Sequence, residues 1–90
     1  MRQIQLYKQA TKFLAALPKK QQLQITAALF SLEQNVQPHD AKKLHGYQHY
    51  YRFDCSEYRI IYDWNDTIVN VYIIGKRNDG DVFRKLQRSL

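Results

Sequence analysis

Polar and apolar positions follow two different repeats in the first half of the chain. Residues 2–7 alternate between polar and apolar side chains, which predicts a short strand. From Lys8 the repeat becomes that of a helix, with one apolar stripe formed by Ala10, Phe13, Leu14 and Leu17. Pro18 ends this helix and suits the first turn of a second one, which runs to about Asn35. The second helix has two possible apolar stripes that it could bury, either Leu23, Ala27 and Phe30 or Ile25, Leu29 and Leu32.

The second half of the chain is typical of strands joined by tight turns. Three runs are rich in β-branched and aromatic residues: Tyr50–Cys55, Tyr58–Trp64 and Thr67–Ile74. Because the connections between them are so short, these strands should form an antiparallel meander. A basic segment, 82–90, is a candidate for a short C-terminal helix. The element order predicts an α+β fold with residues 1–90 as a single domain. In this fold the N-terminal strand, the two-helix hairpin and the meander give one sheet with the helices on one face.

The two tight turns also predict which side chains share a face of the sheet. Across the first turn, Cys55 should lie opposite Tyr58, and across the second, Tyr62 should lie opposite Val69. One face is then apolar and covered by the helices, with Tyr51, Phe53, Cys55, Tyr58, Ile60, Tyr62, Val69, Val71 and Ile73. The other face is mixed, with Tyr50, Arg52, Asp54, Arg59, Ile61, Asn70, Tyr72 and Ile74.

Charge and cysteine content narrow the range of partners and locations. The chain has 14 Lys and Arg against 8 Asp and Glu, a formal net charge of +6, which favours polyanionic partners. Cationic side chains interleaved with aromatic ones on one sheet face are typical of nucleic-acid binding. The single cysteine excludes an intrachain disulfide, and no apolar run is long enough for a membrane span. We therefore expect a cytoplasmic protein without a membrane partner.

Several motifs resemble the RelE/ParE superfamily of toxins from toxin–antitoxin pairs. They are Lys43-Leu44-His45-Gly46-Tyr47, Tyr51-Arg52-Phe53, Glu57-Tyr58-Arg59-Ile60-Ile61-Tyr62, Gly75-Lys76-Arg77 and Asp81-Val82-Phe83. The resemblance implies a cognate antitoxin as partner. It implies either cleavage of mRNA in the ribosomal A site, as in RelE-like members, or inhibition of DNA gyrase, as in ParE-like members. The segment 75–82 favours the RelE-like side, with the ribosome and mRNA as further partners. A degenerate member that only binds is the remaining alternative.

The same resemblance assigns roles to individual residues. It implies catalytic roles for Arg52, Arg59 and Arg77, and contacts with the substrate for Lys43, Lys76 and Phe83. Two positions depart from the pattern, since Asp54 stands where the best-known RelE-type toxins have a lysine and Phe83 replaces a functional tyrosine.

RNA cleavage by a 2′-hydroxyl needs a proton acceptor and a group that stabilises the anionic phosphorane. Arginines suit the second role but not the first, because they remain protonated. Asp54 and His49 are the candidate general bases, although a carboxylate opposite Arg59 should have a lowered pKa. The spacing of the histidines, without an accompanying Cys or acidic ligand set, does not indicate a metal site. We therefore expect no metal, no small-molecule cofactor and a metal-independent endoribonuclease.

Overall fold

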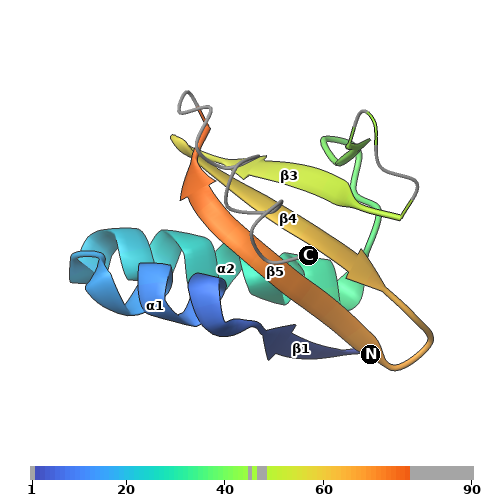
Figure 1. Cartoon of the computed structure of the whole chain (residues 1–90), viewed down its shortest axis with the longest axis horizontal. Coiled ribbons are helices and arrows are strands. Elements are labelled where there is room, and N and C mark those ends of the chain that lie inside the picture. Colours follow the sequence, from blue (N-terminus) through green and yellow to red (C-terminus); the bar gives the residue numbers. More distant parts are fainter. Residues whose placement is uncertain (1, 45, 47–48, 78–90) are drawn as a thin grey trace.

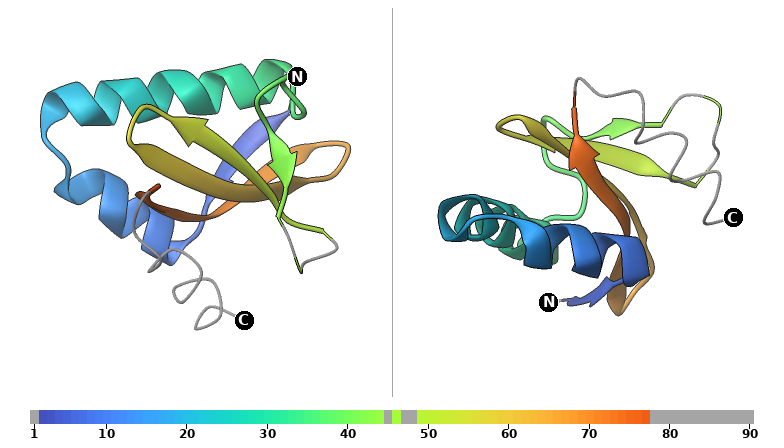
Figure 2. Two further views of the ribbon diagram at one scale, coloured as in Figure 1. Left: turned by 90° about the horizontal axis from the view of Figure 1, so that it is seen from above. Right: turned by 60° about the vertical axis from the view of Figure 1, so that its left-hand side comes forward.

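The computed structural model describes residues 2–44, 46 and 49–77, and these contain two helices and a five-stranded sheet. The predicted elements follow in the predicted order, and one short strand that was not predicted lies between the second helix and the meander. The elements are β1 (Gln3–Leu6), α1 (Lys8–Ala16), α2 (Lys19–Gln34), β2 (Lys42–Lys43), β3 (Tyr51–Cys55), β4 (Tyr58–Trp64) and β5 (Ile68–Lys76). Both helices lie on one side of the sheet, as expected (Figure 1; Figure 2). The α+β fold predicted from the sequence is confirmed, whereas the predicted C-terminal helix over 82–90 lies outside the described residues.

The sheet extends beyond the predicted meander at both edges. Its strand order is β1-β5-β4-β3-β2, with β1 parallel to β5 and the other pairs antiparallel. The parallel pair joins the first strand of the chain to β5, and Gln3 lies beside Ile68. At the opposite edge, the short strand β2 pairs with the beginning of β3. This second pairing brings the loop that precedes β2 towards the mixed face of the sheet, which contains Arg52 and Arg59.

The predicted register is confirmed on one side of β4 and wrong on the other. Between β3 and β4, Cys55 pairs with Tyr58 and Asp54 with Arg59, as expected from the two-residue turn. Between β4 and β5, Tyr62 pairs with Val71 rather than Val69, because four residues lie between the paired Trp64 and Val69 instead of the two of the predicted turn. A second shift of the register, a β-bulge, lies between Ile61 and Tyr62. This β-bulge inserts Tyr72 into β5 as an extra residue.

The bulge exchanges the faces of two neighbouring isoleucines. Ile74 packs in the main core under the helices, and Ile73 packs on the opposite face with Ile61 and Leu44. Both isoleucines are fully buried. The opposite face therefore has a small apolar cluster of its own, which fixes the end of β2 against the sheet.

The main core lies between the helices and the sheet, and it decides the orientation of α2. Ile25, Leu29 and Leu32 are buried, whereas Leu23 and Phe30 are 59% and 58% exposed. Of the two possible stripes, the helix thus buries the second. Tyr62 is fully buried, and its hydroxyl donates a 2.7 Å hydrogen bond to the carbonyl oxygen of Val36, which satisfies this polar atom within the core. In the described part of the chain, no helix is long and apolar enough to cross a membrane.

Beyond the end of β1, the side chain of a glutamine in α1 forms hydrogen bonds with the backbone of β5. The Tyr7 N–H donates to the carbonyl oxygen of Val71 at 3.0 Å, and the backbone pairing with β1 stops there. Beyond it, the side-chain amide of Gln9 donates to the carbonyl oxygen of Ile74 at 3.0 Å and accepts from the Ile74 N–H at 2.9 Å. The amide group thereby replaces a missing backbone partner and ties α1 to the sheet.

Candidate functional site

Cationic side chains from separate segments surround one pocket at the β2 edge of the sheet. The pocket has a volume of about 460 Å³ and is lined by His39, Asp40, Lys42, Arg52, Asp54 and Arg77. We call it the cationic pocket. Of the three arginines predicted to act in catalysis, Arg52 and Arg77 line it directly. Its lining residues come from the loop before β2, from β2, from β3 and from the residue that follows β5.

Local backbone structure brings these segments together. The Ala41 N–H donates to the carbonyl oxygen of Pro38 at 2.9 Å, which closes a turn with His39 and Asp40 at its two central positions. Lys42 then pairs with Arg52 across the β2–β3 ladder, so both side chains point to the same face. At the other side, the Arg77 N–H donates to the carbonyl oxygen of Glu57 at 2.8 Å and extends the pairing of β4 with β5 by one residue.

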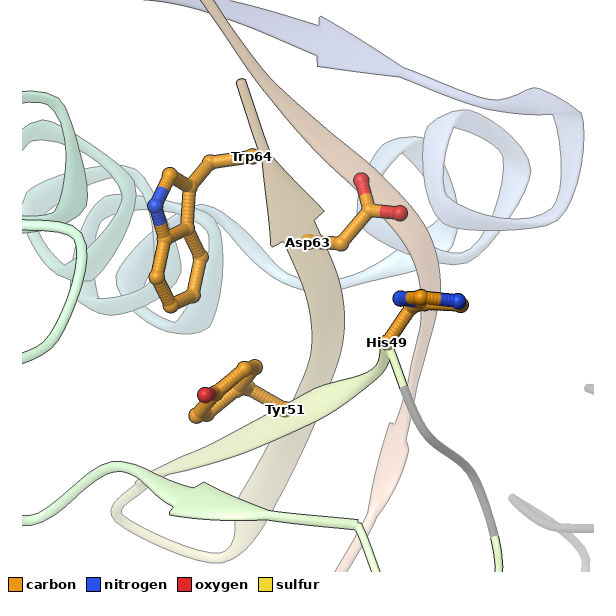
Figure 3. A pocket seen from close by; sticks show the side chains of 4 residues that line it. All are labelled: His49, Tyr51, Asp63 and Trp64. Carbon is orange, nitrogen blue, oxygen red and sulfur yellow. The ribbon is translucent and has the colours of Figure 1, made fainter. Parts of the chain in front are cut away.

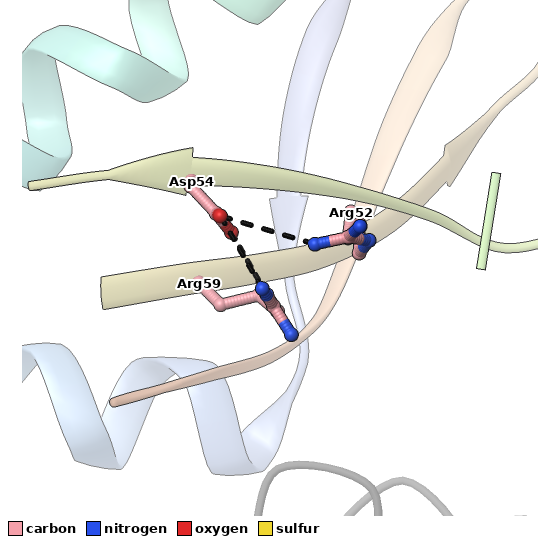
Figure 4. A network of polar contacts seen from close by, with 3 residues as sticks. All are labelled: Arg52, Asp54 and Arg59. Carbon is pink, nitrogen blue, oxygen red and sulfur yellow. Dashed lines mark hydrogen bonds and ion pairs between the residues drawn. The ribbon is translucent and has the colours of Figure 1, made fainter. Parts of the chain in front are cut away.

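Asp54 lies between two of the three arginines (Figure 4). Its carboxylate accepts hydrogen bonds from Arg59 Nε at 2.8 Å and from Arg59 Nη2 at 3.3 Å, and its Oδ2 lies 3.9 Å from Arg52 Nη1. The hydrogen bond from Arg59, together with the positive charge of that residue, holds the pKa of Asp54 below its ordinary value, against the opposing effect of burial. In the free protein this carboxylate is therefore a weak proton acceptor.

Among the described residues, Lys43, Lys76 and His49 do not line the cationic pocket. Lys43 is exposed and pairs with Tyr51, so its register is that of the helix-covered face. Lys76 is exposed and pairs with Tyr58 at the end of β5. Phe83 lies outside the described residues. His49, one of the two candidate bases, lines a different pocket.

That second pocket, which we call the aromatic pocket, is lined by His49, Tyr51, Asp63 and Trp64 and has a volume of about 360 Å³ (Figure 3). The rings of Tyr51 and Trp64 lie 4.7 Å apart between centroids. Asp63 accepts hydrogen bonds from the Tyr72 hydroxyl and the Asn70 amide, each at 2.9 Å. Burial, and then the hydrogen bond to Asp63, raise the pKa of Tyr72. The carboxylate in this pocket is thus paired with neutral donors.

Three residues of the cationic pocket, His39, Asp40 and Lys42, were not predicted as site residues. His39 and Asp40 belong to a segment that the sequence indicates only as a loop, and their proximity to the arginines depends on the pairing of β2 with β3. The strand β2 consists of two lysines, so it has no hydrophobic pattern from which it could be predicted. Among the described residues, no three His, Cys, Asp or Glu side chains are close enough together to hold a metal ion.

Residues 4–80 match the family described as the ParE toxin of the type II toxin–antitoxin system, parDE. Because this match covers most of the described fold, the chain belongs to that family of toxins, as its motifs predicted. No curated protein matches the chain in sequence.

Solved structures with the same fold are RelE and YoeB proteins. The archaeal RelE–RelB complex from Pyrococcus horikoshii OT3 contains a similar chain with a TM-score of 0.71 and 28% identity, over 88% of this chain and 97% of that one. The isolated RelE toxin of E. coli has a TM-score of 0.74 and 22% identity, over 100% of both chains. The YoeB dimer from Staphylococcus aureus has a TM-score of 0.68 and 22% identity, over 87% of this chain and 98% of that one. At 22% identity the two bacterial similarities concern the fold alone.

Proposed function

We propose that this toxin is a metal-independent endoribonuclease that cuts mRNA on the ribosome, in the cytoplasm, and is silenced by a cognate antitoxin. The observation that carries the proposal is the cationic pocket, where Arg52, Arg77 and Lys42 line one space and Arg59 lies behind Asp54. Guanidinium groups bind phosphate oxygens in pairs and keep their charge at neutral pH. The similarity to the archaeal RelE chain supports mRNA as the substrate, which is the substrate that the RelE-like motifs imply.

The proposed reaction is an internal transfer at one phosphate of the message. The 2′-oxygen forms a bond to phosphorus, the bond from phosphorus to the 5′-oxygen breaks, and a 2′,3′-cyclic phosphate and a 5′-hydroxyl result. One proton leaves the 2′-hydroxyl and another reaches the 5′-oxygen. Arg52, Arg59 and Arg77 stabilise the negative charge of the phosphorane, a kind of contribution for which single donors are worth about 10²–10³ in rate. Lys43 and Lys76 contact the RNA outside the pocket, and Phe83 is a further proposed contact with the substrate.

His39 is the proposed proton acceptor. It lines the same pocket as Arg52 and Arg77, whereas His49 lines the aromatic pocket. Asp54, the other candidate base, is engaged by Arg59 and Arg52 and has a lowered pKa. Imidazole groups commonly serve as general bases when they are within reach of the reacting hydroxyl.

The proposed antitoxin is a protein with an acidic segment. Similar toxins have been crystallised with RelB antitoxins from Pyrococcus horikoshii and Methanococcus jannaschii. In this chain the net charge of +6 and the open cationic pocket favour a partner of opposite charge. Such a segment would silence the toxin by occupying the phosphate-binding arginines.

A second candidate function is inhibition of DNA gyrase without nuclease activity. The matching family is described as ParE toxin, which supports this alternative. A degenerate member that binds nucleic acid or antitoxin without cleavage is the third candidate. Both would use the same fold, and neither requires the arginines to surround a reacting phosphate.

Primer extension on a defined mRNA in a reconstituted translation system separates these candidates. The parent protein should produce cuts in the codon at the ribosomal A site, and none when ribosomes are absent. Arg77→Gln should lower the cleavage rate about 10²–10³-fold. Lys12→Gln, which removes the same charge from an exposed position on α1, should cleave as the parent does. An intact message with the parent protein, combined with loss of supercoiling in a gyrase assay, would replace the nuclease proposal by the second candidate.

A further inference from the structure

A carboxylate of the protein itself, that of Asp54, contacts Arg59 and Arg52, two of the arginines that the proposed function assigns to phosphate. Arg59 offers Asp54 two parallel N–H groups, at 2.8 and 3.3 Å, and this is the fork geometry in which arginine also binds phosphate. Arg52 lies within ion-pair distance of the same carboxylate. Asp54 thus holds the position that a phosphate oxygen pair would take on Arg59 (Figure 4).

The order of the side chains from the solvent inward adds to this observation. Asp54 lines the cationic pocket, but Arg59 is not among its lining residues. The side chain of Arg59 is 15% exposed, against 30% for Asp54 and 29% for Arg52. An anion that enters the pocket therefore meets the negative charge of Asp54 before it reaches the donors of Arg59.

We infer that Asp54 is an internal competitor of RNA phosphate, which weakens binding of free RNA and makes the site depend on message held in place by the ribosome. The inference rests on the proposed function and adds a specificity-determining residue to it. A phosphate must either replace the carboxylate on Arg59 or bind beside it against charge repulsion. Both routes weaken the binding of loose strands, because such strands have no other contacts to offset the cost. A strand already positioned by the ribosome brings its phosphate to the pocket without that cost.

Binding of free RNA to the full chain tests the inference without cleavage. The probe is a fluorescent single-stranded oligoribonucleotide with 2′-O-methyl groups, which has no attacking hydroxyl. Asp54→Asn keeps the size of the side chain and an acceptor for Arg59, and it should bind this RNA about tenfold more tightly at low salt. If one further phosphate is then engaged, the plot of log Kd against log salt should steepen by about 0.7.

Asp66→Asn is the matched control, because it raises the net charge by the same amount from an exposed turn at the other end of β4. It should tighten binding much less than Asp54→Asn. Equal effects of the two variants would reduce the result to net charge and overturn the inference, as would unchanged or weaker binding by Asp54→Asn. Circular dichroism reports whether each variant is folded, and Asp54→Ala serves as a second variant with the same expectation.

Cleavage assays separate this inference from the proposed function. If the parent cleaves on ribosomes but Asp54→Asn binds free RNA no better, only the role of Asp54 is wrong. If Asp54→Asn binds RNA more tightly but the parent protein never cleaves, the nuclease proposal fails and the competition at Arg59 stands. When both hold, Asp54→Asn should also begin to cut RNA in the absence of ribosomes.

Discussion

The cationic and aromatic pockets each contain a histidine and at least one carboxylate, but the partners of Asp54 in the first and of Asp63 in the second differ. In the cationic pocket, Asp54 is bound by guanidinium groups that carry full positive charges. In the aromatic pocket, Asp63 is bound by a tyrosine hydroxyl and an amide, which are neutral. The first arrangement surrounds a space that attracts anions, and the second satisfies a carboxylate within a largely aromatic part of the sheet. The charge of the partners, rather than the presence of His and Asp, distinguishes the two sites.

Separate replacement of the two histidines is the most direct test of this comparison. His39→Gln should lower the rate of ribosome-dependent cleavage about 100-fold, because it removes the proposed proton acceptor from the cationic pocket. His49→Gln alters the aromatic pocket and should cleave at a rate close to that of the parent. Single-turnover cleavage on stalled ribosomes measures both. The reverse pattern would assign the base to His49 and refute the role given to His39.

Removal of the carboxylate from the aromatic pocket should affect stability instead of cleavage. Asp63→Ala leaves the Tyr72 hydroxyl and the Asn70 amide without their acceptor, which should lower the free energy of unfolding by about 1–3 kcal/mol. Urea unfolding followed by circular dichroism measures this change. Asp66→Ala, on the neighbouring exposed turn, is the control and should stay within about 0.5 kcal/mol of the parent. Loss of cleavage by folded Asp63→Ala would contradict the separation of the two pockets.

The smallest expected effect is the contribution of the Asp54 ion pair to stability. Because the folded protein lowers the pKa of Asp54, the ionised carboxylate stabilises the fold above its unfolded pKa of about 4, and this contribution is lost as the pH falls through the lower folded value. Asp54→Asn should therefore lose less stability than the parent between pH 7 and pH 3. Partial exposure keeps the difference under about 1 kcal/mol. Urea midpoints at the two pH values provide the comparison, and identical pH dependence would show that the pair does not stabilise the fold.

Short-range patterns in the sequence were enough to predict every described element except β2, and one of the strand registers. The two-residue turn after Cys55 fixes β3 against β4, and with it the contact between Asp54 and Arg59. The bulge in β5 was not predictable, because Ile73 and Ile74 are both apolar and either can face the helices. A pattern with a period of two cannot locate a bulge between such residues. The bulge is visible only when the packing of Ile73 against Leu44 is known.

The candidate site was predictable to a similar degree. Arg52 and Arg77 were both expected to take part in catalysis, and both line the cationic pocket. The loop that contains His39 was not predicted to reach them, since its position depends on β2, whose pairing has no signal in the sequence. The residues that line the pocket from β3 and from the end of β5 were therefore easier to anticipate than those on the loop before β2, whose position depends on contacts between distant segments.

The parallel pairing of β1 with β5 has a consequence for the order of folding. β1 is synthesised before the other described strands, but its partner is β5, which follows all the other described elements. Contacts between segments so distant in the chain form late, because the entropy of closing the intervening loop must be offset first. During synthesis the sheet therefore stays incomplete until β5 is free to pair. Arg77 joins the pocket only after that step, so a growing chain carries no assembled cationic site towards the ribosome that is making it.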